Sequence, residues 1–461
     1  MTRIHLIGIG GTGLSAIARV LLEMGHTVSG SDRVESSSTG DLQSAGATIN
    51  IGHQPENVRG AELVVRSSAI PDDNPEVIAA RALRIPVLKR GDFLGSLMDG
   101  KTGIAIAGTH GKTTTTSMIA WMLSALDQDP SFIVGGVLAN LGVNARSGKG
   151  DTFVIEADEY DRMFLGLKPT IEVVTNIEHD HPDCYSTPAD FQAAFVDFMY
   201  QLPANGTLVA CAEDPGANEL MDKAEKLGKA VIPYGLRPST KAILPLNAYT
   251  NVLAPNENGG FSFRASVLGT TATVDLQVPG IHNVRNALAA LTVAKLLDLP
   301  IAAAAKALDQ FTGTRRRFEV RGEANGILII DDYAHHPTEI RATLAAARTR
   351  YPSRRIWAVW QPHTYSRTQV LFNEFADAFA DADEVIVTEI YAAREPKRVF
   401  SSKQVVEAMP RPAHFIAELS EASNYLITNL RPGDALLVLS AGDADQVSTD
   451  VLTHLKEASN G

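Results

Sequence analysis

Two glycine-rich turns, each lying between a short apolar segment and a helix-like segment, constrain the fold of this chain most strongly. The first turn, Gly8–Gly13, follows the apolar run Ile4–Ile7, and the second, Gly108–Thr113, follows Ile104–Ala107. A buried strand that ends in a glycine turn and leads into a helix is the repeating unit of a parallel sheet with helical crossovers. The chain is therefore predicted to be an α/β protein.

The alternation of strands and helices occurs in three consecutive blocks. The chain has 461 residues, about three times the ~150 residues that one domain typically contains. The polar turn Met98–Gly103 separates the first block from the second. We predict an N-terminal Rossmann-like domain (1–99), a central P-loop ATPase-like domain (100–312) and a C-terminal Rossmann-like α/β domain (313–461). Polar and apolar residues alternate over Gly260–Val278, which predicts a small antiparallel β insertion in the central domain.

The C-terminal block carries the clearest periodicity. It predicts strands over Ile327–Ile330, Ile356–Trp360 and Ala435–Leu439, the last of which ends the series. It predicts helices over Thr338–Thr349 and Arg367–Ala380.

Composition narrows the class of partner. Lysine and arginine total 41 against 53 for aspartate and glutamate, a net charge of -12, which argues against nucleic acid or an anionic membrane as the partner. The two cysteines, Cys184 and Cys211, are too few for a disulfide framework. No apolar stretch reaches the ~18 residues of a membrane span. We expect a soluble cytoplasmic protein, a monomer or weak homodimer, that acts on small molecules.

The first glycine turn has the spacing of a diphosphate-binding loop. Gly8, Gly10 and Gly13 fit G-x-G-x-x-G, and Asp32 follows at the end of the next expected strand. Glycines at these positions let backbone N–H groups and a helix N-terminus approach a diphosphate. A tight turn without a ligand is the less favoured interpretation. A nicotinamide dinucleotide and a UDP-sugar both satisfy the pattern, so the nucleotide stays open at this point.

The second glycine turn places Lys112 and Thr113 at the start of a helix. An ammonium group and a hydroxyl at that position suit the phosphates of ATP and their Mg²⁺. The turn departs from the full P-loop pattern because Ile106 stands where the first glycine would be. We nevertheless favour an ATP site over a threonine-rich surface turn because the motif lies between a strand and a helix.

Carboxylates and imidazoles follow the next strands of the central block. Glu156 ends one expected strand, and His181 lies shortly beyond the following one. The carboxyl ends of parallel strands meet at one edge of a sheet, so both residues are candidate metal ligands beside the ATP phosphates. Solvated or structural roles are expected instead for Asp158, Glu159 and His179.

Amide and basic groups recur farther along the chain. Asn283 and Asn286 lie one helical turn apart and suit the edge of an adenine, although helix capping is an alternative. Arginines at 315–317 and histidines near later strand ends make a carboxylate or phosphate substrate plausible in an otherwise acidic chain.

Taken together, these segments resemble the Mur ligase family along nearly the whole chain, and its alanine-adding branch most closely. The matching segments, in chain order, are GIGGTG, GTHGKTTTT, EADEYD, TNIEHDH, PGIHNVRNALAA, RRRFE, DDYAHHPTE, QPHTYSRT and IYAARE. The resemblance implies that ATP phosphorylates the carboxylate of UDP-N-acetylmuramate. The amine of L-alanine then attacks the acyl phosphate, giving an amide, ADP and phosphate.

The resemblance also implies a role for individual residues. The implied catalytic residues are Lys112, Glu156, His181, Arg317 and His336. The implied ATP contacts are Gly108, Thr109, His110, Gly111, Lys112, Thr113, Thr114, Asn283, Asn286, Arg317 and Asp332. The implied UDP-sugar contacts are Gly8, Gly10, Gly11, Gly13, Asp32, Ser67 and Ser68. The implied amino-acid contacts are Tyr333, His336, His363 and Arg367. The implied Mg²⁺ ligands are Thr113 and Glu156 for one ion and His181 for a second.

Some positions depart from the family pattern. Family members that add later amino acids carry a carbamylated lysine after the aspartate–histidine pair, whereas residues 185–206 contain no lysine, in agreement with the alanine-adding branch. Pro182 and Thr364 replace the more usual residues near the amino-acid pocket. Three alternatives stay open: an NAD-dependent oxidoreductase, a non-catalytic nucleotide-regulated scaffold, and the recycling ligase that attaches a whole tripeptide to UDP-N-acetylmuramate.

Overall fold

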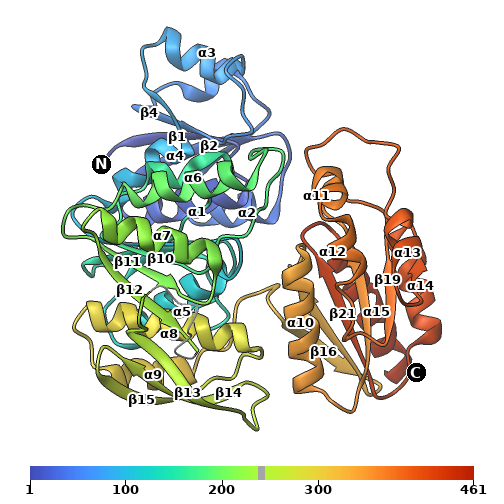
Figure 1. Ribbon diagram of the computed structural model, residues 1–461. Coiled ribbons are helices and arrows are strands. Elements are labelled where there is room, and N and C mark those ends of the chain that lie inside the picture. The colour runs from blue at the N-terminus through green and yellow to red at the C-terminus, as the bar shows by residue number, and fades with distance from the viewer. Residues whose placement is uncertain (237–243, 461) are drawn as a thin grey trace.

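The computed structural model describes residues 1–236 and 244–460 and contains three β-sheets that follow one another along the chain (Figure 1). Residues 237–243 and 461, which belong to the second and third predicted domains, lie outside the described residues. Strands and helices interleave throughout, so the predicted α/β class is confirmed. Within the described ranges, no helix combines the length and apolar character needed to cross a membrane.

The first sheet is entirely parallel and has its crevice beside the first glycine turn. Its strand order is β3 (Thr48–Ile51), β2 (Thr27–Asp32), β1 (Arg3–Ile7), β4 (Leu63–Arg66) and β5 (Val87–Lys89). Its helices are α1 (Thr12–Glu23), α2 (Ser37–Ser44), α3 (Pro75–Ala82) and α4 (Arg90–Leu94). The chain order reverses between β1 and β4, which is where open α/β sheets bind ligands.

The second sheet brings the predicted phosphate-binding strands side by side. β6 (Thr102–Ala107) pairs in parallel with both β9 (Thr152–Glu156) and β10 (Ile171–Val174). The rest of the sheet consists of β7 (Ser131–Ile133), β8 (Ala145–Arg146), β11 (Thr207–Cys211), β12 (Ala230–Gly235), β13 (Ala248–Pro255), β14 (Phe261–Val267) and β15 (Thr270–Asp275). β13, β14 and β15 are antiparallel to one another. The β insertion is therefore confirmed, but it begins at Ala248, earlier than predicted.

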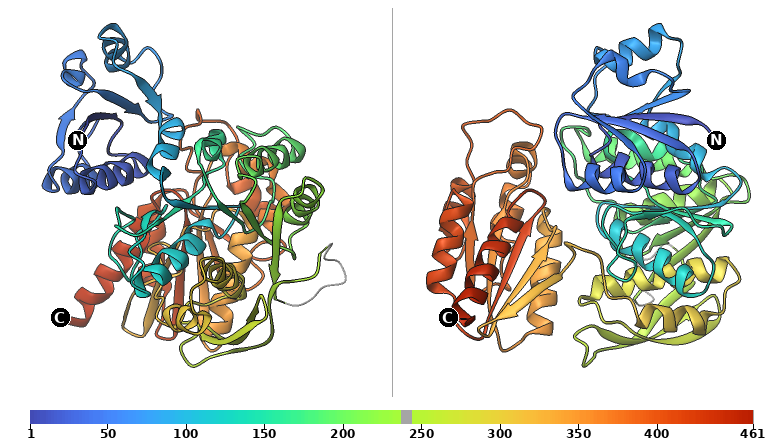
Figure 2. Two further views of the ribbon diagram at one scale, coloured as in Figure 1. Left: turned by 90° about the vertical axis from the view of Figure 1, so that its left-hand side faces the viewer. Right: turned by 180° about the vertical axis from the view of Figure 1, so that it is seen from behind.

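Helices cover both faces of the second sheet. α5 (Lys112–Ala125), α8 (Ile281–Leu296) and α9 (Ile301–Asp309) share one apolar cluster with it. α6 (Pro188–Met199) and α7 (Pro215–Lys226) pack in a different cluster, which also contains Leu14, Ile17 and Leu21 of α1. The N-terminal and central domains thus share one continuous core, and they lie end to end in Figures 1 and 2.

The third sheet has the order β16 (Glu319–Ala324), β17 (Ile327–Asp332), β21 (Asp434–Ser440), β18 (Arg355–Gln361), β19 (Glu384–Val387) and β20 (His414–Phe415). β16 is antiparallel to β17, whereas the other pairs are parallel. The last strand in the chain, β21, therefore lies inside the sheet, between β17 and β18. The main helices are α10 (Pro337–Arg350), α13 (Lys403–Ala408), α14 (Leu419–Asn429) and α15 (Asp445–Asn460).

The single helix predicted over Arg367–Ala380 is wrong. The segment forms two short helices, α11 (Tyr365–Val370) and α12 (Phe372–Ala376), separated at Leu371, whose φ and ψ are -103° and 29°. After this change of direction, the ring of Phe375 stacks on Trp360, with ring centroids 4.6 Å apart. Aromatic packing in the core, which periodicity alone does not encode, is the physical reason for the break.

The C-terminal domain has its own apolar core. Among the described residues, the two clusters that fill it contain no residue of the other two domains. Figures 1 and 2 show this domain standing beside the central one. The side chains that bridge the two domains are therefore mainly polar, and they surround the candidate site.

Candidate active site

The carboxyl edge of the first sheet gathers the predicted UDP-sugar residues. Gly8 has a φ of +84°, and a Cβ there would lie 3.2 Å from Cβ of Ser67. The N–H of Gly10 donates to Oδ2 of Asp32 at 2.8 Å. Gly11 is the N-cap of α1, and Gly13 is the second residue of that helix. The hydroxyl of Ser68 points to the sulfur of Met163 in the central domain, 3.6 Å away.

One cation at this edge was missed by the sequence analysis. Arg90 follows β5, and a Cβ on Gly13 would lie 1.5 Å from its Nη1, so the guanidinium covers the start of α1. Its polar partners are the sulfur of Met163 and, at 3.4 Å, Oδ2 of Asp158. A positive group beside a helix N-terminus is unfavourable until an anion lies between them.

The second glycine turn wraps closely around the end of β6. A Cβ on Gly108 would lie 2.0 Å from Oγ1 of Thr175, and Gly111 has a φ of +81°. The ammonium of Lys112 donates to the carbonyls of Gly108 and Thr109 and to Glu159 at 2.9 Å. Burial lowers the pKa of Lys112, but Glu159 and Glu156 outweigh it and the pKa is raised, so the ammonium stays charged.

Glu156 lies at the position expected of a cation ligand. Its Oε1 accepts from Oγ1 of Thr113 at 2.9 Å, and its Oε2 accepts from the N–H of Gly135 at 2.7 Å. A Cβ on Gly135 would stand 2.7 Å from that oxygen, so a larger residue there would displace the Glu156 carboxylate. Burial raises the pKa of Glu156, although the nearby charges of Lys112 and Arg317 oppose the shift.

Glu159 and His181 extend this cluster. Oε1 of Glu159 lies 3.4 Å from Nε2 of His181, while Oε2 of Glu159 and Nδ1 of His181 are buried without a hydrogen-bond partner. Burial lowers the pKa of His181, but Asp180 and Glu159 raise it above its usual value. The unpartnered carboxylate oxygen of Glu159 is the kind of ligand that Mg²⁺ prefers beside ATP phosphates, and the nitrogen of His181 can join it once the imidazole has lost its proton. Glu159, for which a structural role was expected, belongs to this cluster.

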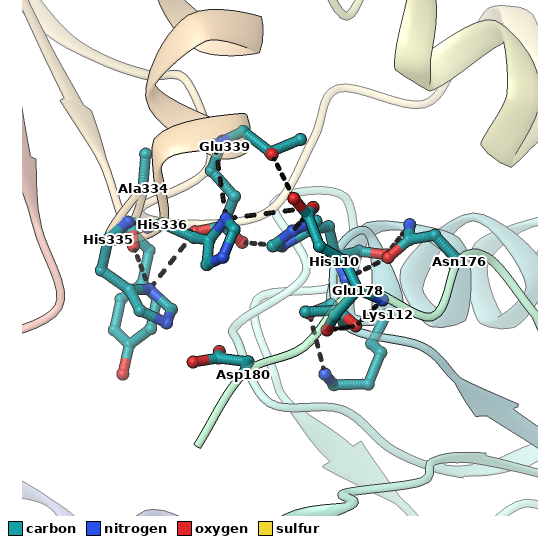
Figure 3. A network of polar contacts seen from close by, with 12 residues as sticks. His110, Lys112, Asn176, Glu178, Asp180, Ala334, His335, His336 and Glu339 are labelled. Carbon is teal, nitrogen blue, oxygen red and sulfur yellow. Dashed lines mark hydrogen bonds and ion pairs between the residues drawn. The ribbon is translucent and has the colours of Figure 1, made fainter. Parts of the chain in front are cut away.

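A polar cluster joins this region to the C-terminal domain (Figure 3). The imidazole of His110 lies between Glu178, at 2.8 Å, and Glu339 of α10, at 3.2 Å. Burial lowers the pKa of His110, but the two carboxylates outweigh it and raise the pKa to about 9. Thr338 donates to Glu178 at 2.9 Å. The phosphate-binding loop is thus tied to α10 by a protonated histidine.

His336 lies against this cluster. Its ring centroid is 4.6 Å from that of His110. Burial and the charge of His110 lower the pKa of His336 to about 4, and its Nε2 is buried without a partner. Ligand atoms of His110, Glu178 and His336 all lie within 4.8 Å of one another, a spacing that could hold a metal ion. Because the pKa of His110 is raised to about 9, its imidazole holds a proton near pH 7, and this favours the ion pairs with Glu178 and Glu339 over a metal ion at this position.

The predicted adenine and ribose residues line a cavity of about 970 Å³ between the central and C-terminal domains. In it, Asn286 donates to Oδ1 of Asn283 at 3.0 Å, and Asn283 donates to the carbonyl of Pro279 at 2.7 Å. Asp332 accepts from two backbone N–H groups, and burial raises its pKa to about 6. Arg317 bridges the cavity to the phosphate loop, with Nη2 3.3 Å from Oγ1 of Thr113. Thr114 and Gly111 also line the cavity.

Three of the predicted amino-acid residues, Tyr333, His363 and Arg367, are linked to one another through His335 and a direct contact. Arg367 is only 3% exposed and pairs with Asp180 of the central domain through Nε at 2.7 Å and Nη2 at 3.2 Å. Its Nη1 lies 3.0 Å from Nδ1 of His363, and burial lowers the pKa of His363 to about 3. Tyr333 lies under the guanidinium of Arg317, 4.9 Å from it.

His335 was missed by the sequence analysis. Its ring centroid is 5.4 Å from that of Tyr333 and 5.9 Å from that of His363, so it lies within the predicted amino-acid group. The His335-His336 doublet was a signal for it, but periodicity cannot tell which of two adjacent histidines faces the pocket. Figure 3 shows both rings beside Asp180.

Comparison with known proteins accounts for this arrangement. Three family models match in series: "Mur ligase family, catalytic domain" over residues 3–102, "Mur ligase middle domain" over 106–294 and "Mur ligase, glutamate ligase domain" over 316–442. The UDP-N-acetylmuramate–L-alanine ligase of Geobacter sulfurreducens is 44% identical over 99% of this chain and 98% of its own length. The corresponding ligase of Bordetella petrii is 44% identical over 96% and 97%.

Comparison with solved structures leads to the same family. The UDP-N-acetylmuramate-alanine ligase of Thermotoga maritima superposes with a TM-score of 0.81 at 28% identity, covering 99% of this chain and all of that one. A murein peptide ligase from Psychrobacter arcticus gives a TM-score of 0.72 at 26% identity, covering 99% of both chains. The three models together span most of the sequence, and the chain belongs to the Mur ligase family.

Proposed function

We propose that this protein is an ATP-dependent ligase that joins L-alanine to the lactyl carboxylate of UDP-N-acetylmuramate, a step of peptidoglycan synthesis and cell wall biogenesis. The observation that carries the proposal is the 44% identity, over nearly the full length of both chains, to ligases named for this reaction. We also propose that the reaction takes place in the cytoplasm and that the protein is a monomer or weak homodimer.

Each domain receives one substrate in this proposal. Residues 1–99 bind the UDP-sugar at the first glycine turn, with Asp32, Ser67 and Ser68 around it. Residues 100–312 bind ATP through the loop that ends in Lys112 and Thr113. Residues 313–461 bring L-alanine to the edge of the central sheet. The boundaries follow the three separate sheets.

The first chemical step transfers a phosphoryl group. An oxygen of the lactyl carboxylate attacks the γ-phosphorus of ATP, and ADP leaves with the electrons of the broken bond. Lys112 and Arg317 offset the negative charge that develops, while Glu156, Thr113 and His181 would hold Mg²⁺. Mg²⁺, when bound, neutralises phosphate oxygens and aligns them.

The second step forms the amide. The amine of L-alanine attacks the carbonyl carbon of the acyl phosphate, and inorganic phosphate leaves as the amine loses its proton. His336 is neutral near pH 7 because its pKa is lowered to about 4, so its imidazole can exchange a proton with the reacting groups. Tyr333, His363 and Arg367 orient the amino acid. Positioning and charge neutralisation account for this chemistry without a covalent enzyme intermediate.

A phosphate-release assay tests the proposal. Purified protein is given ATP, Mg²⁺ and UDP-N-acetylmuramate, together with L-alanine, glycine, L-serine or the tripeptide that recycling ligases use. We expect ATP-dependent product formation that is fastest with L-alanine. A preference for the tripeptide would reassign the chain to the murein peptide ligases. Nicotinamide-dependent turnover without ATP would refute ligase function.

A further inference from the structure

Two arginines of the C-terminal domain hold the two ends of a short loop of the central domain. This loop, residues 180–183, carries His181 and is called here the His181 loop. Arg367 binds its first residue, Asp180, and Arg394 binds its last residue, Asp183. Neither Arg394 nor Asp183 belongs to any substrate site described above.

The first contact reaches the backbone of His181. Oδ1 of Asp180 accepts from Nε of Arg367 and from the N–H of His181, both at 2.7 Å. Asp180 and Arg367 are 4% and 3% exposed. A buried, two-point ion pair of this kind fixes the geometry of both partners. The position of Arg367 therefore determines where the backbone of His181 lies.

The second contact reaches the side chain of His181. Nη2 and Nε of Arg394 donate to Oδ2 of Asp183 at 2.6 and 3.0 Å, and the hydroxyl of Tyr160 donates to the same oxygen at 3.1 Å. The guanidinium of Arg394 also covers the Tyr160 ring, 4.1 Å from its centroid. The Tyr160 ring in turn meets the imidazole of His181 edge to face, with centroids 5.2 Å apart.

The conformation of the His181 loop requires such support. His181 has a φ of +55°, in the left-handed region that residues other than glycine rarely adopt. The segment that carries Tyr160 contains two more such residues, Asp161 and Arg162, each with a φ of +53°. Backbone strain of this kind persists when surrounding contacts determine the conformation, and it concentrates where a side chain must be held for function.

The domain that supplies both arginines shares no apolar cluster with the central domain among the described residues. Polar contacts, including these two, therefore fix its docked position. Undocking would release Arg367 and Arg394 together, and the His181 loop would lose both supports.

We propose that Arg394, acting through Asp183 and Tyr160, is a positioning residue that orients His181 for cation binding when the C-terminal domain is docked. The inference rests on the proposed function, in which His181 serves a Mg²⁺ ion. The proposal links delivery of the amino acid with phosphoryl transfer, because docking of the C-terminal domain completes the cation site of the central domain.

A charge swap tests this coupling. Arg394→Glu and Asp183→Arg each break the contact, and the double variant restores it with the charges exchanged. Arg398→Glu is the matched control, because Arg398 lies in the same segment and contacts Gln369 and Glu395 of its own domain. Mn²⁺ binding, measured by electron paramagnetic resonance with ADP and UDP-N-acetylmuramate present, reports the cation site without turnover. Steady-state kinetics measure the effect of each variant on turnover, and circular dichroism checks that each variant is folded.

We expect each single variant to weaken Mn²⁺ binding and lower kcat by about 5- to 30-fold, the effect of one partly exposed ion pair plus one cation–π contact. The KM for UDP-N-acetylmuramate should stay unchanged, the double variant should recover most of the Mn²⁺ affinity, and Arg398→Glu should resemble the unmodified protein. Folded single variants that bind Mn²⁺ normally, or a double variant no better than the singles, would overturn the inference. Unmodified protein that binds Mn²⁺ but forms no product with L-alanine would instead refute the proposed function.

Discussion

Docking of the C-terminal domain should weaken as the pH rises through the alkaline range, because His110 links the phosphate-binding loop to Glu339 of α10. The pKa of His110 is raised to about 9 in the docked structure, and undocking removes Glu339 while Glu178, which belongs to the same domain as His110, keeps its contact. The pKa therefore falls on undocking toward its ordinary value of 6.5 without reaching it, and the docked state binds the proton more tightly. The contribution of this proton to docking is fully present below the undocked pKa and is lost as the pH rises through 9.

The size of the effect follows from the same values. The full interval of about 2.5 pKa units corresponds to roughly 3 kcal/mol at 1.36 kcal/mol per unit, and this is an upper limit because Glu178 stays beside His110 after undocking. The pKa of Glu178 is lowered to about 2 by the same interaction with His110, so this shift is not counted a second time. That pKa also lies outside the pH range of the transition. His336, with a pKa of about 4, stays neutral throughout.

Small-angle X-ray scattering of the ligand-free protein at ~pH 6 and ~pH 10 measures docking directly. We expect the radius of gyration to increase over this range, and Glu339→Gln to move the transition to lower pH because it removes one of the two carboxylates. His110→Gln is the control and should abolish the transition between pH 6.5 and 9. An unchanged radius in the unmodified protein, or the same transition in His110→Gln, would refute the reasoning.

Four further predictions concern the substrate sites. Lys112→Ala should lower kcat by about 100-fold or more, because an ammonium that offsets transition-state charge is lost, and it should lower the melting temperature of the folded variant, because buried Glu159 loses its counter-charge; near-normal turnover would contradict the ATP site. Gly135→Ala should raise the Mg²⁺ concentration needed for half-maximal activity, since its Cβ would stand 2.7 Å from Glu156, and an unchanged Mg²⁺ titration would rule this out. Arg90→Met should raise the KM for UDP-N-acetylmuramate by about tenfold and leave that for ATP unchanged; the reverse pattern would place Arg90 elsewhere in the reaction. Turnover should be normal in carbon-dioxide-stripped buffer, because residues 185–206 contain no lysine to carbamylate, and rescue by added bicarbonate would show that another lysine takes that place.

Local signals account for what the sequence predicted well. Lys112 follows β6 after a four-residue turn and Glu156 is the last residue of β9, so parallel pairing of β6 with β9 brings both to one edge without further information. Arg90 lies at the corresponding edge of the first sheet, but it follows a three-residue strand in which two residues are only partly buried and one is exposed, so periodicity did not single it out. Asp180 and Arg367 are far apart in the chain, and their pairing depends on how two domains dock. The break at Leu371 likewise depends on tertiary packing around Trp360.

The separate core of the C-terminal domain also bears on how such an enzyme can change during evolution. One apolar cluster joins the N-terminal domain to the central domain, whereas the C-terminal clusters among the described residues contain no side chain of either domain. A new C-terminal unit can therefore be recombined onto the first two domains without rebuilding a hydrophobic core, provided that the polar bridge to the His181 loop is kept. Exchange of that one module would alter which amino acid is accepted, and the incoming module would have to supply equivalents of Arg317 and Asp332, which line the proposed ATP cavity.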